Sequence, residues 1–190
     1  MRENPPKFNP AVLPAEVMQG FERADFKADS RADSKADSKK ELRHFLYPGQ
    51  VFVTREPIVI STILGSCAAV CLWDRHKKAG GMNHYLLPDG QSDGANRLRY
   101  GNSANPELLK QVLALGCEVR NLQAKIFGGS SAFGADPSRS LGSRNVQLAE
   151  AFLRSAGIPV LERDVSGKRG RRLVFQIADG VTTIKNFDQV

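Results

Sequence analysis

The 190-residue chain is long enough for one domain of ordinary size together with a tail, and its formal net charge at pH 7 is +7. No apolar run approaches the roughly 18 residues of a membrane helix, and the N-terminus lacks an apolar signal core, so we expect no insertion into a membrane. Three cysteines are an odd number and do not form a disulfide framework, which favours a reducing cytoplasm.

Residues 1–42 are predicted to form a disordered, low-complexity tail. A four-residue unit occurs there three times, beginning at Lys27, Arg31 and Lys35. Alanine is the largest apolar residue of this repeat, so the repeat cannot bury enough surface to offset the loss of chain entropy on ordering. We therefore expect the folded domain to comprise residues 43–190.

The positive charge belongs to that domain. Residues 1–42 hold eight basic and eight acidic side chains, which leaves 19 basic and 12 acidic side chains in the remainder of the chain. A basic domain favours an acidic partner, and nucleic acid and an acidic protein surface both fit this charge. The sequence has no interleaved aromatic and basic motif of the kind that binds RNA.

Eight strands and two helices are predicted in the domain. The strands are expected at Val51–Arg55, Ile58–Leu64, Ala68–Trp73, Met82–Leu87, Leu122–Phe127, Val160–Val165, Arg172–Ala178 and Val181–Lys185. A polar loop covers Gly90–Asn102, and Asn105-Pro106-Glu107 has the capping residue, proline and acidic group that open a helix. That helix is expected to end at Gly116, and the second to run from about Ser143 to Ala156.

Turn signals connect the last three strands. Asp179-Gly180 is a strong hairpin signal, and the glycine-containing turn Ser166–Gly170 is expected to form the tip of a second hairpin. Hairpins without regular alternation of strands and helices predict an α+β fold. We expect a layered α/β sandwich of mostly antiparallel strands and hairpins, flanked by two main helices.

The residues with the clearest chemistry lie between Val59 and Pro88. If the polar turn at Asp74–Lys78 is tight, the hairpin places Cys67 directly opposite His84. Opposed side chains have Cβ atoms about 5 Å apart, and an imidazole beside a thiol is the usual activator of a cysteine nucleophile. We therefore take Cys67 and His84 as a candidate catalytic pair.

Other interpretations of these two residues stay open. A cysteine that only packs, or a buried histidine bonded to backbone, needs no chemistry. A metal site that includes Cys67 and Cys71 is disfavoured, because residues four apart on a strand are about 13 Å apart. A catalytic imidazole also needs a third group that holds its tautomer, and Ser61 and Thr62 on the preceding strand carry suitable hydroxyls.

Two further segments have a functional and a plain interpretation. The run Gly128-Gly129-Ser130-Ser131 lacks the lysine of a phosphate-binding loop, so it either lines the wall of an active site or forms a turn. The cluster Lys168, Arg169, Arg171 and Arg172 is either a solvated turn or a docking patch for an acidic protein.

Taken together, these segments resemble the CheD family, the chemoreceptor glutamine deamidases of bacterial chemotaxis. The resemblance rests on Gly65–Asp74 and Gly80–Pro88, and it continues through Arg99–Gly101, Lys125–Gly129, Gly142–Asn145, Asp164–Gly167 and Gly170–Arg172. It covers nearly all of residues 45–186 and none of the repeat.

The resemblance implies hydrolysis of selected glutamine side-chain amides on methyl-accepting chemotaxis receptors, giving glutamate and ammonia. It implies Cys67 as the nucleophile and His84 as the general base. The family's threonine, six positions before the cysteine, falls on Ser61, with Thr62 beside it. No cofactor or metal is needed for this chemistry, and the receptor is the expected partner rather than nucleic acid.

Two rival functions remain at this point. One is another thiol enzyme, a protease or a transglutaminase, which cleaves a peptide bond or incorporates an amine instead of releasing ammonia. The other is a non-catalytic adaptor that binds receptors or a CheC-type phosphatase, a partner that the resemblance implies for some members of the family.

Overall fold

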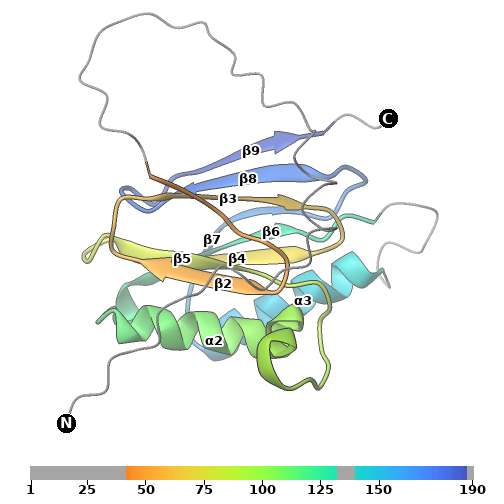
Figure 1. Ribbon diagram of the computed structural model, residues 1–190, viewed down its shortest axis with the longest axis horizontal. Coiled ribbons are helices and arrows are strands. Elements are labelled where there is room, and N and C mark those ends of the chain that lie inside the picture. The colour runs from red at the N-terminus through yellow and green to blue at the C-terminus, as the bar shows by residue number, and fades with distance from the viewer. Residues whose placement is uncertain (1–41, 132–139, 188–190) are drawn as a thin grey trace, which may run out of the picture. The chain divides into compact units, whose positions relative to one another are not determined.

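The computed structural model describes residues 42–131 and 140–187, which form three layers (Figure 1). The first layer, sheet A, has the strand order β1-β3-β8-β9: Arg43–Phe45, Val59–Leu64, Arg171–Gln176 and Thr182–Asn186. The middle layer, sheet B, has the order β2-β5-β4-β6-β7: Gln50–Thr54, Ala79–His84, Ala68–Asp74, Leu122–Gly128 and Val160–Val165.

The third layer consists of two helices. They are α2 (Gly101–Ala114) and α3 (Leu141–Ser155), and they cover the face of sheet B that points away from sheet A. Two short 3₁₀ helices, η1 (Gly94–Arg99) and η2 (Val119–Asn121), flank α2 in sequence. These layers confirm the predicted α+β sandwich. No helix in the described parts of the chain is long and apolar enough to span a bilayer.

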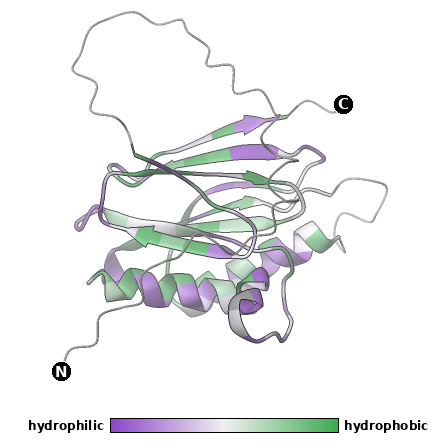
Figure 2. Ribbon diagram, viewed as in Figure 1, coloured by the Kyte–Doolittle hydropathy of each residue, from purple (hydrophilic) through white to green (hydrophobic). Residues whose placement is uncertain are grey.

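Sheet B is buried on both faces, and this explains the apolar run in β4. Ala68, Val70 and Leu72 join a core against the helices, whereas Ala69 and Cys71 join a second core against sheet A. A strand that is covered on both sides reads as a continuous apolar segment rather than an alternating one. In Figure 2 the strands of sheet B are mostly green or white, whereas purple and green alternate along the helices.

The predicted hairpin of β4 and β5 forms, but its register was wrong. Asp74 pairs with Ala79 across a four-residue turn, because its carboxylate accepts hydrogen bonds from the amides of His76 and Lys77 at 2.9 and 3.0 Å. In this register His84 lies opposite Ala69 and not opposite Cys67, which comes just before β4. A shift of two residues keeps every side chain on its expected face.

Other boundaries also differ from the sequence prediction, and β5 is Ala79–His84 rather than Met82–Leu87. Helix α2 begins at Gly101, so part of the predicted polar loop is helical and Pro106 lies inside the helix. The first helical amides, those of Gly101 and Asn102, donate to the carbonyls of Leu87 and Pro88, a tertiary contact that no local pattern contains. Strand β1 was not predicted.

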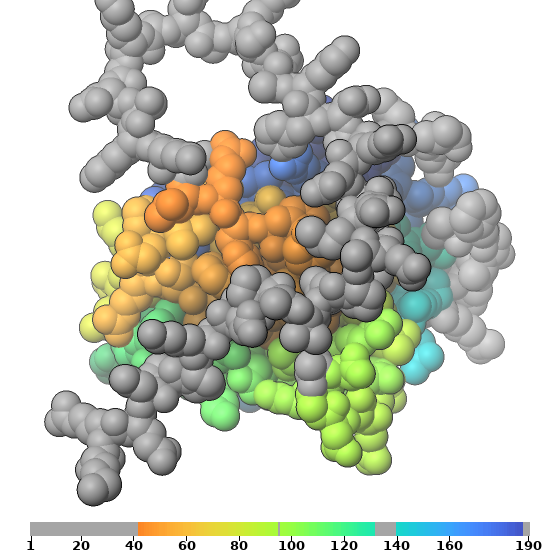
Figure 3. Space-filling view, viewed as in Figure 1, coloured from red at the N-terminus to blue at the C-terminus, as the bar shows by residue number. Residues whose placement is uncertain are grey.

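On the face in Figure 3, the orange segment that includes β1 and β2 lies above the green η1 and α2.

The predicted hairpin across Ser166–Gly170 is also wrong. Strand β7 belongs to sheet B and β8 belongs to sheet A, so this segment carries the chain from one sheet to the other. The hairpin predicted at Asp179-Gly180 does form, since β8 and β9 pair in antiparallel fashion. The predicted low-complexity tail lies, except for Leu42, outside the described residues.

Candidate active site

The candidate nucleophile lies where the chain crosses from sheet A to sheet B. The three residues Gly65-Ser66-Cys67 join the end of β3 to the start of β4. The segment after β6 holds this crossing in place: the Gly129 amide donates to the Cys67 carbonyl at 2.7 Å, and the Ser130 amide donates to the Gly65 carbonyl at 2.9 Å. Cys67 is a free, half-buried thiol at the edge of the inter-sheet core.

His84 ends β5, and its imidazole is bonded to a hydroxyl from the other sheet. The Nδ1 atom lies 2.8 Å from Thr62 Oγ1, and Thr62 Oγ1 donates its own hydrogen to the Leu46 carbonyl at 2.7 Å. Since the only hydroxyl hydrogen is used on Leu46, the hydroxyl must accept from Nδ1–H. The neutral ring then carries a lone pair on Nε2, which is buried and has no hydrogen-bond partner among the described residues.

Burial keeps both members of the pair neutral at rest. Loss of solvation lowers the pKa of His84 to about 4, because the side chain is only 1% exposed and the imidazolium is poorly solvated there. Loss of solvation also raises the pKa of the Cys67 thiol, although its own backbone amide opposes this shift. A neutral imidazole with a lone pair on Nε2 can accept a proton, which is the property of a general base.

The two candidate hydroxyls lie on opposite faces of β3. Thr62 is fully buried with Ile60 and Leu64, on the face toward sheet B. Ser61 is half-buried on the other face, because successive residues of a strand point to opposite sides. The structure therefore brings Thr62 to His84 and leaves Ser61 away from it, although the family resemblance pointed to Ser61 first.

Asn145 on α3 is a site residue that sequence reasoning did not assign. Its fully buried side-chain amide donates at 2.9 Å to the carbonyl of Ser66 and at 2.9 Å to that of Leu86. These carbonyls lie one residue before Cys67 and two residues after His84, so one side chain ties both segments together. The sequence held one signal of this role, because Asn145 is a polar residue next to Val146, which belongs to the buried apolar face of the helix.

A cavity of about 300 Å³ opens beside the crossing, and we call it the thiol-side cavity. Its lining residues are Gly65, Ser66, Ser130, Ser131, Ser140, Leu141, Gly142, Lys168 and Gly170. Ser66 precedes Cys67 directly. Ser130 is 3% exposed, and its hydroxyl has no hydrogen-bond partner among the described residues. A buried hydroxyl in a cavity wall is a suitable ligand for a polar group that enters.

Comparison with known proteins points to one family. A family model described as CheD chemotactic sensory transduction matches residues 86–186, a stretch that includes Asn145 and begins just after His84. A protein of Anaeromyxobacter dehalogenans named probable chemoreceptor glutamine deamidase CheD 1 is 46% identical over 142 residues, which are 74% of this chain and 82% of that protein.

Two further relatives carry the name probable chemoreceptor glutamine deamidase CheD. The protein of Rhodospirillum rubrum is 44% identical over 143 residues, covering 74% of this chain and 80% of its own length. The protein of Trichlorobacter lovleyi is 39% identical over 143 residues, covering 75% of this chain and 89% of its own length.

Replacing the hydroxyl of Thr62 tests the bond between the sheets. Thr62→Val keeps the shape of the side chain but removes the hydroxyl that bonds both His84 Nδ1 and the Leu46 carbonyl, so we expect the free energy of unfolding to fall by about 1–3 kcal/mol. Ser61→Ala is the matched control and should change it by less than about 0.5 kcal/mol. Urea unfolding measures both, and an equal loss in the two variants would contradict the assignment.

The low pKa of His84 predicts a pH dependence of stability. Between pH 6.5 and about 4 the unfolded chain binds a proton on this residue and the folded chain does not, so the stability rises with pH across that window. Wild type should lose up to about 3 kcal/mol more than His84→Gln as the pH falls from 7 to 4. Urea unfolding at several pH values checks this, and parallel profiles for the two proteins would refute it.

Proposed function

Because the chain belongs to the CheD family, we propose that it hydrolyses side-chain amides of selected glutamines on chemoreceptors. The products are glutamate and ammonia. The observation that carries this proposal is the similarity to chemoreceptor glutamine deamidases over most of both chains, in a molecule with a free thiol at the sheet crossing. The three free cysteines suit a reducing compartment, and we propose the cytoplasm.

In the proposed reaction, Cys67 attacks the amide carbon of the glutamine side chain. His84 Nε2 takes the thiol proton as the sulfur–carbon bond forms, and it then delivers that proton to the amide nitrogen, so that ammonia leaves and a thioester remains. Water next attacks the thioester, His84 accepts one of its protons and returns it to the sulfur, and glutamate is released. One water molecule is consumed for each ammonia released.

Thr62 and Asn145 act through other groups in this proposal. By accepting from Nδ1–H, Thr62 keeps the Nε2 lone pair available for the thiol proton. The Asn145 amide holds the carbonyls on either side of the pair, so the thiol and the imidazole are positioned before substrate arrives. Preorganised groups need little rearrangement in the transition state.

The glutamine side chain is proposed to enter the thiol-side cavity and to contact Ser130. Its carboxamide offers both a donor and an acceptor, so either hydrogen-bonding sense satisfies the unpartnered Ser130 hydroxyl. A buried polar group without a partner costs about 1–3 kcal/mol, and substrate binding would recover part of that cost.

The rival functions explain less of this arrangement. An adaptor has no use for a buried imidazole held in one tautomer on the face of sheet B that also carries a free thiol, a combination that is typical of catalytic sites. A protease or a transglutaminase would use the same pair, but the relatives are named glutamine deamidases. A CheC-type regulatory partner stays a prediction.

Mass spectrometry of a receptor cytoplasmic fragment tests the reaction. Wild type should replace side-chain NH₂ groups by OH at particular glutamines, whereas Cys67→Ala and His84→Ala should leave the fragment unchanged. Cys71→Ala is the matched control, because Cys71 is fully buried on β4 and has no part in the proposed chemistry. Full deamidation by Cys67→Ala would refute the thiol mechanism.

Ser130→Ala separates substrate binding from folding. Removal of a buried hydroxyl that has no partner should leave the melting temperature unchanged or raised, while the KM for the receptor fragment rises about fivefold to tenfold. Ser131→Ala, a half-buried neighbour in the wall of the same cavity, is the control and should change KM little. An unchanged KM in Ser130→Ala would remove Ser130 from the binding site.

A further inference from the structure

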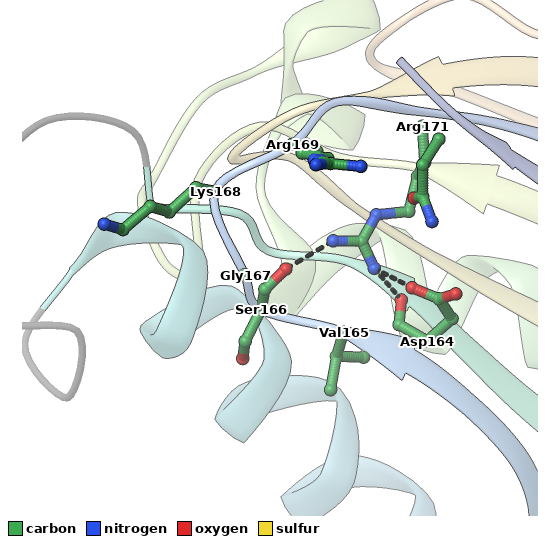
Figure 4. A pocket seen from close by; sticks show the side chains of 8 residues that line it. Asp164, Val165, Ser166, Gly167, Lys168, Arg169 and Arg171 are labelled. Atoms are coloured by element: carbon green, nitrogen blue, oxygen red, sulfur yellow. Dashed lines mark hydrogen bonds and ion pairs between the residues drawn. The ribbon is translucent and has the colours of Figure 1, made fainter. Parts of the chain in front are cut away.

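A second cavity adjoins the thiol-side cavity and contains most of a cationic cluster. It has a volume of about 430 Å³ and is lined by Asp164, Val165, Ser166, Gly167, Lys168, Arg169, Arg171 and Asn186 (Figure 4). It forms where residues 166–170 carry the chain from β7 to β8, and we call this segment the basic crossover. Lys168 lines both cavities, so the two hollows share a wall.

Backbone hydrogen bonds hold the basic crossover beside the nucleophile. The Ser131 amide donates to the Gly167 carbonyl at 2.8 Å, and the Ser166 amide donates to the Gly128 carbonyl at 2.9 Å. The same segment after β6 is bonded to Cys67 and Gly65. The position of the crossover relative to the thiol is therefore set by the main chain rather than by flexible side chains.

The charge of this region is strongly positive. Residues 164–172 contain four cations, Lys168, Arg169, Arg171 and Arg172, and one carboxylate, Asp164. Arg171 is 3% exposed, and its guanidinium bonds the Asp164 carboxylate and the carbonyls of Asp164 and Ser166 (Figure 4). Arg171 thus offsets the only acidic side chain of the cavity and braces the crossover, while Lys168 and Arg169 are exposed.

We propose that the basic crossover docks an acidic segment of the receptor next to the glutamine that enters the thiol-side cavity. The proposal rests on the proposed deamidase function, and it assigns to Lys168 and Arg169 the selection of substrate by charge. Because the cavities share Lys168, residues that flank a glutamine in the thiol-side cavity are within reach of the basic crossover. Exposed cations beside a reactive site speed the encounter with a partner of opposite charge.

The lining of the cavity favours an acidic peptide over nucleic acid. Proteins that bind single-stranded nucleic acid combine cations with aromatic rings on which bases stack. No aromatic ring is among the residues that line either cavity. Carboxylates need only the cations, which form short charge-assisted hydrogen bonds with them.

A charge-swap experiment tests this docking. Two peptides that share one glutamine but carry either glutamates or lysines on both sides of it are incubated with each protein, and ammonia release gives kcat/KM. Wild type should prefer the acidic peptide by about tenfold or more, mainly through KM, and this preference should shrink as the salt concentration rises. Lys168→Glu/Arg169→Glu should abolish or invert the preference.

Matched variants separate docking from net charge and from folding. Arg75→Glu/Lys77→Glu makes the same change in net charge on the exposed turn at the far end of β4, and it should keep the wild-type preference. If the double variant does not fold, Lys168→Glu alone serves in its place. It should reduce the logarithm of the ratio of the two kcat/KM values to half of its wild-type value or less. Equal melting temperatures in all of these proteins would show that the substitutions leave the fold intact.

The outcomes distinguish this inference from the proposed function. If wild type deamidates both peptides equally well, the docking proposal fails and the deamidase stands. If wild type deamidates neither peptide nor a receptor fragment, the proposed function fails. Binding of polyuridylate that depends on Lys168 and Arg169, together with no preference between the peptides, would assign the surface to nucleic acid and overturn the proposal.

Discussion

The site depends on one hydrogen bond between two sheets, from His84 Nδ1–H to Thr62 Oγ1. Its acceptor belongs to β3 in sheet A and its donor ends β5 in sheet B, so it forms only when the sheets are packed face to face. The same packing removes water from the imidazole and lowers its pKa. A folded core therefore determines both the tautomer and the protonation state of the candidate base.

The two segments that cross between the sheets place the thiol and the cations at one end of the sandwich. Residues 65–67 cross from β3 to β4 with the thiol, and residues 166–170 cross from β7 to β8 with the cations. The segment that follows β6 bonds to both crossings through its backbone. Loops held by a rigid scaffold are common positions for functional residues, because the scaffold supplies precision that an isolated loop lacks.

The sequence by itself determined the classes of element and the faces of most residues. The apolar run Ala68–Trp73 identified β4, and apolar residues at helical spacing identified α2 and α3, because these patterns reflect burial within each element. The register of β4 and β5 was wrong by two residues, yet Cys67 and His84 kept the same face because side chains alternate with a period of two. The hairpin pattern therefore singled out Cys67 and His84 as a candidate pair, and their catalytic roles stay a prediction.

Only the tertiary structure decided which residues meet across elements. It placed Thr62 rather than Ser61 against His84, since the facing sheet selects one side of β3. The structure also showed that residues 166–170 cross between the sheets instead of forming a hairpin. It showed that the Asn145 side chain donates hydrogen bonds to the carbonyls of Ser66 and Leu86. These contacts join residues 22 to 79 positions apart in the chain, and a local pattern carries no information about them because they form only when separate elements pack.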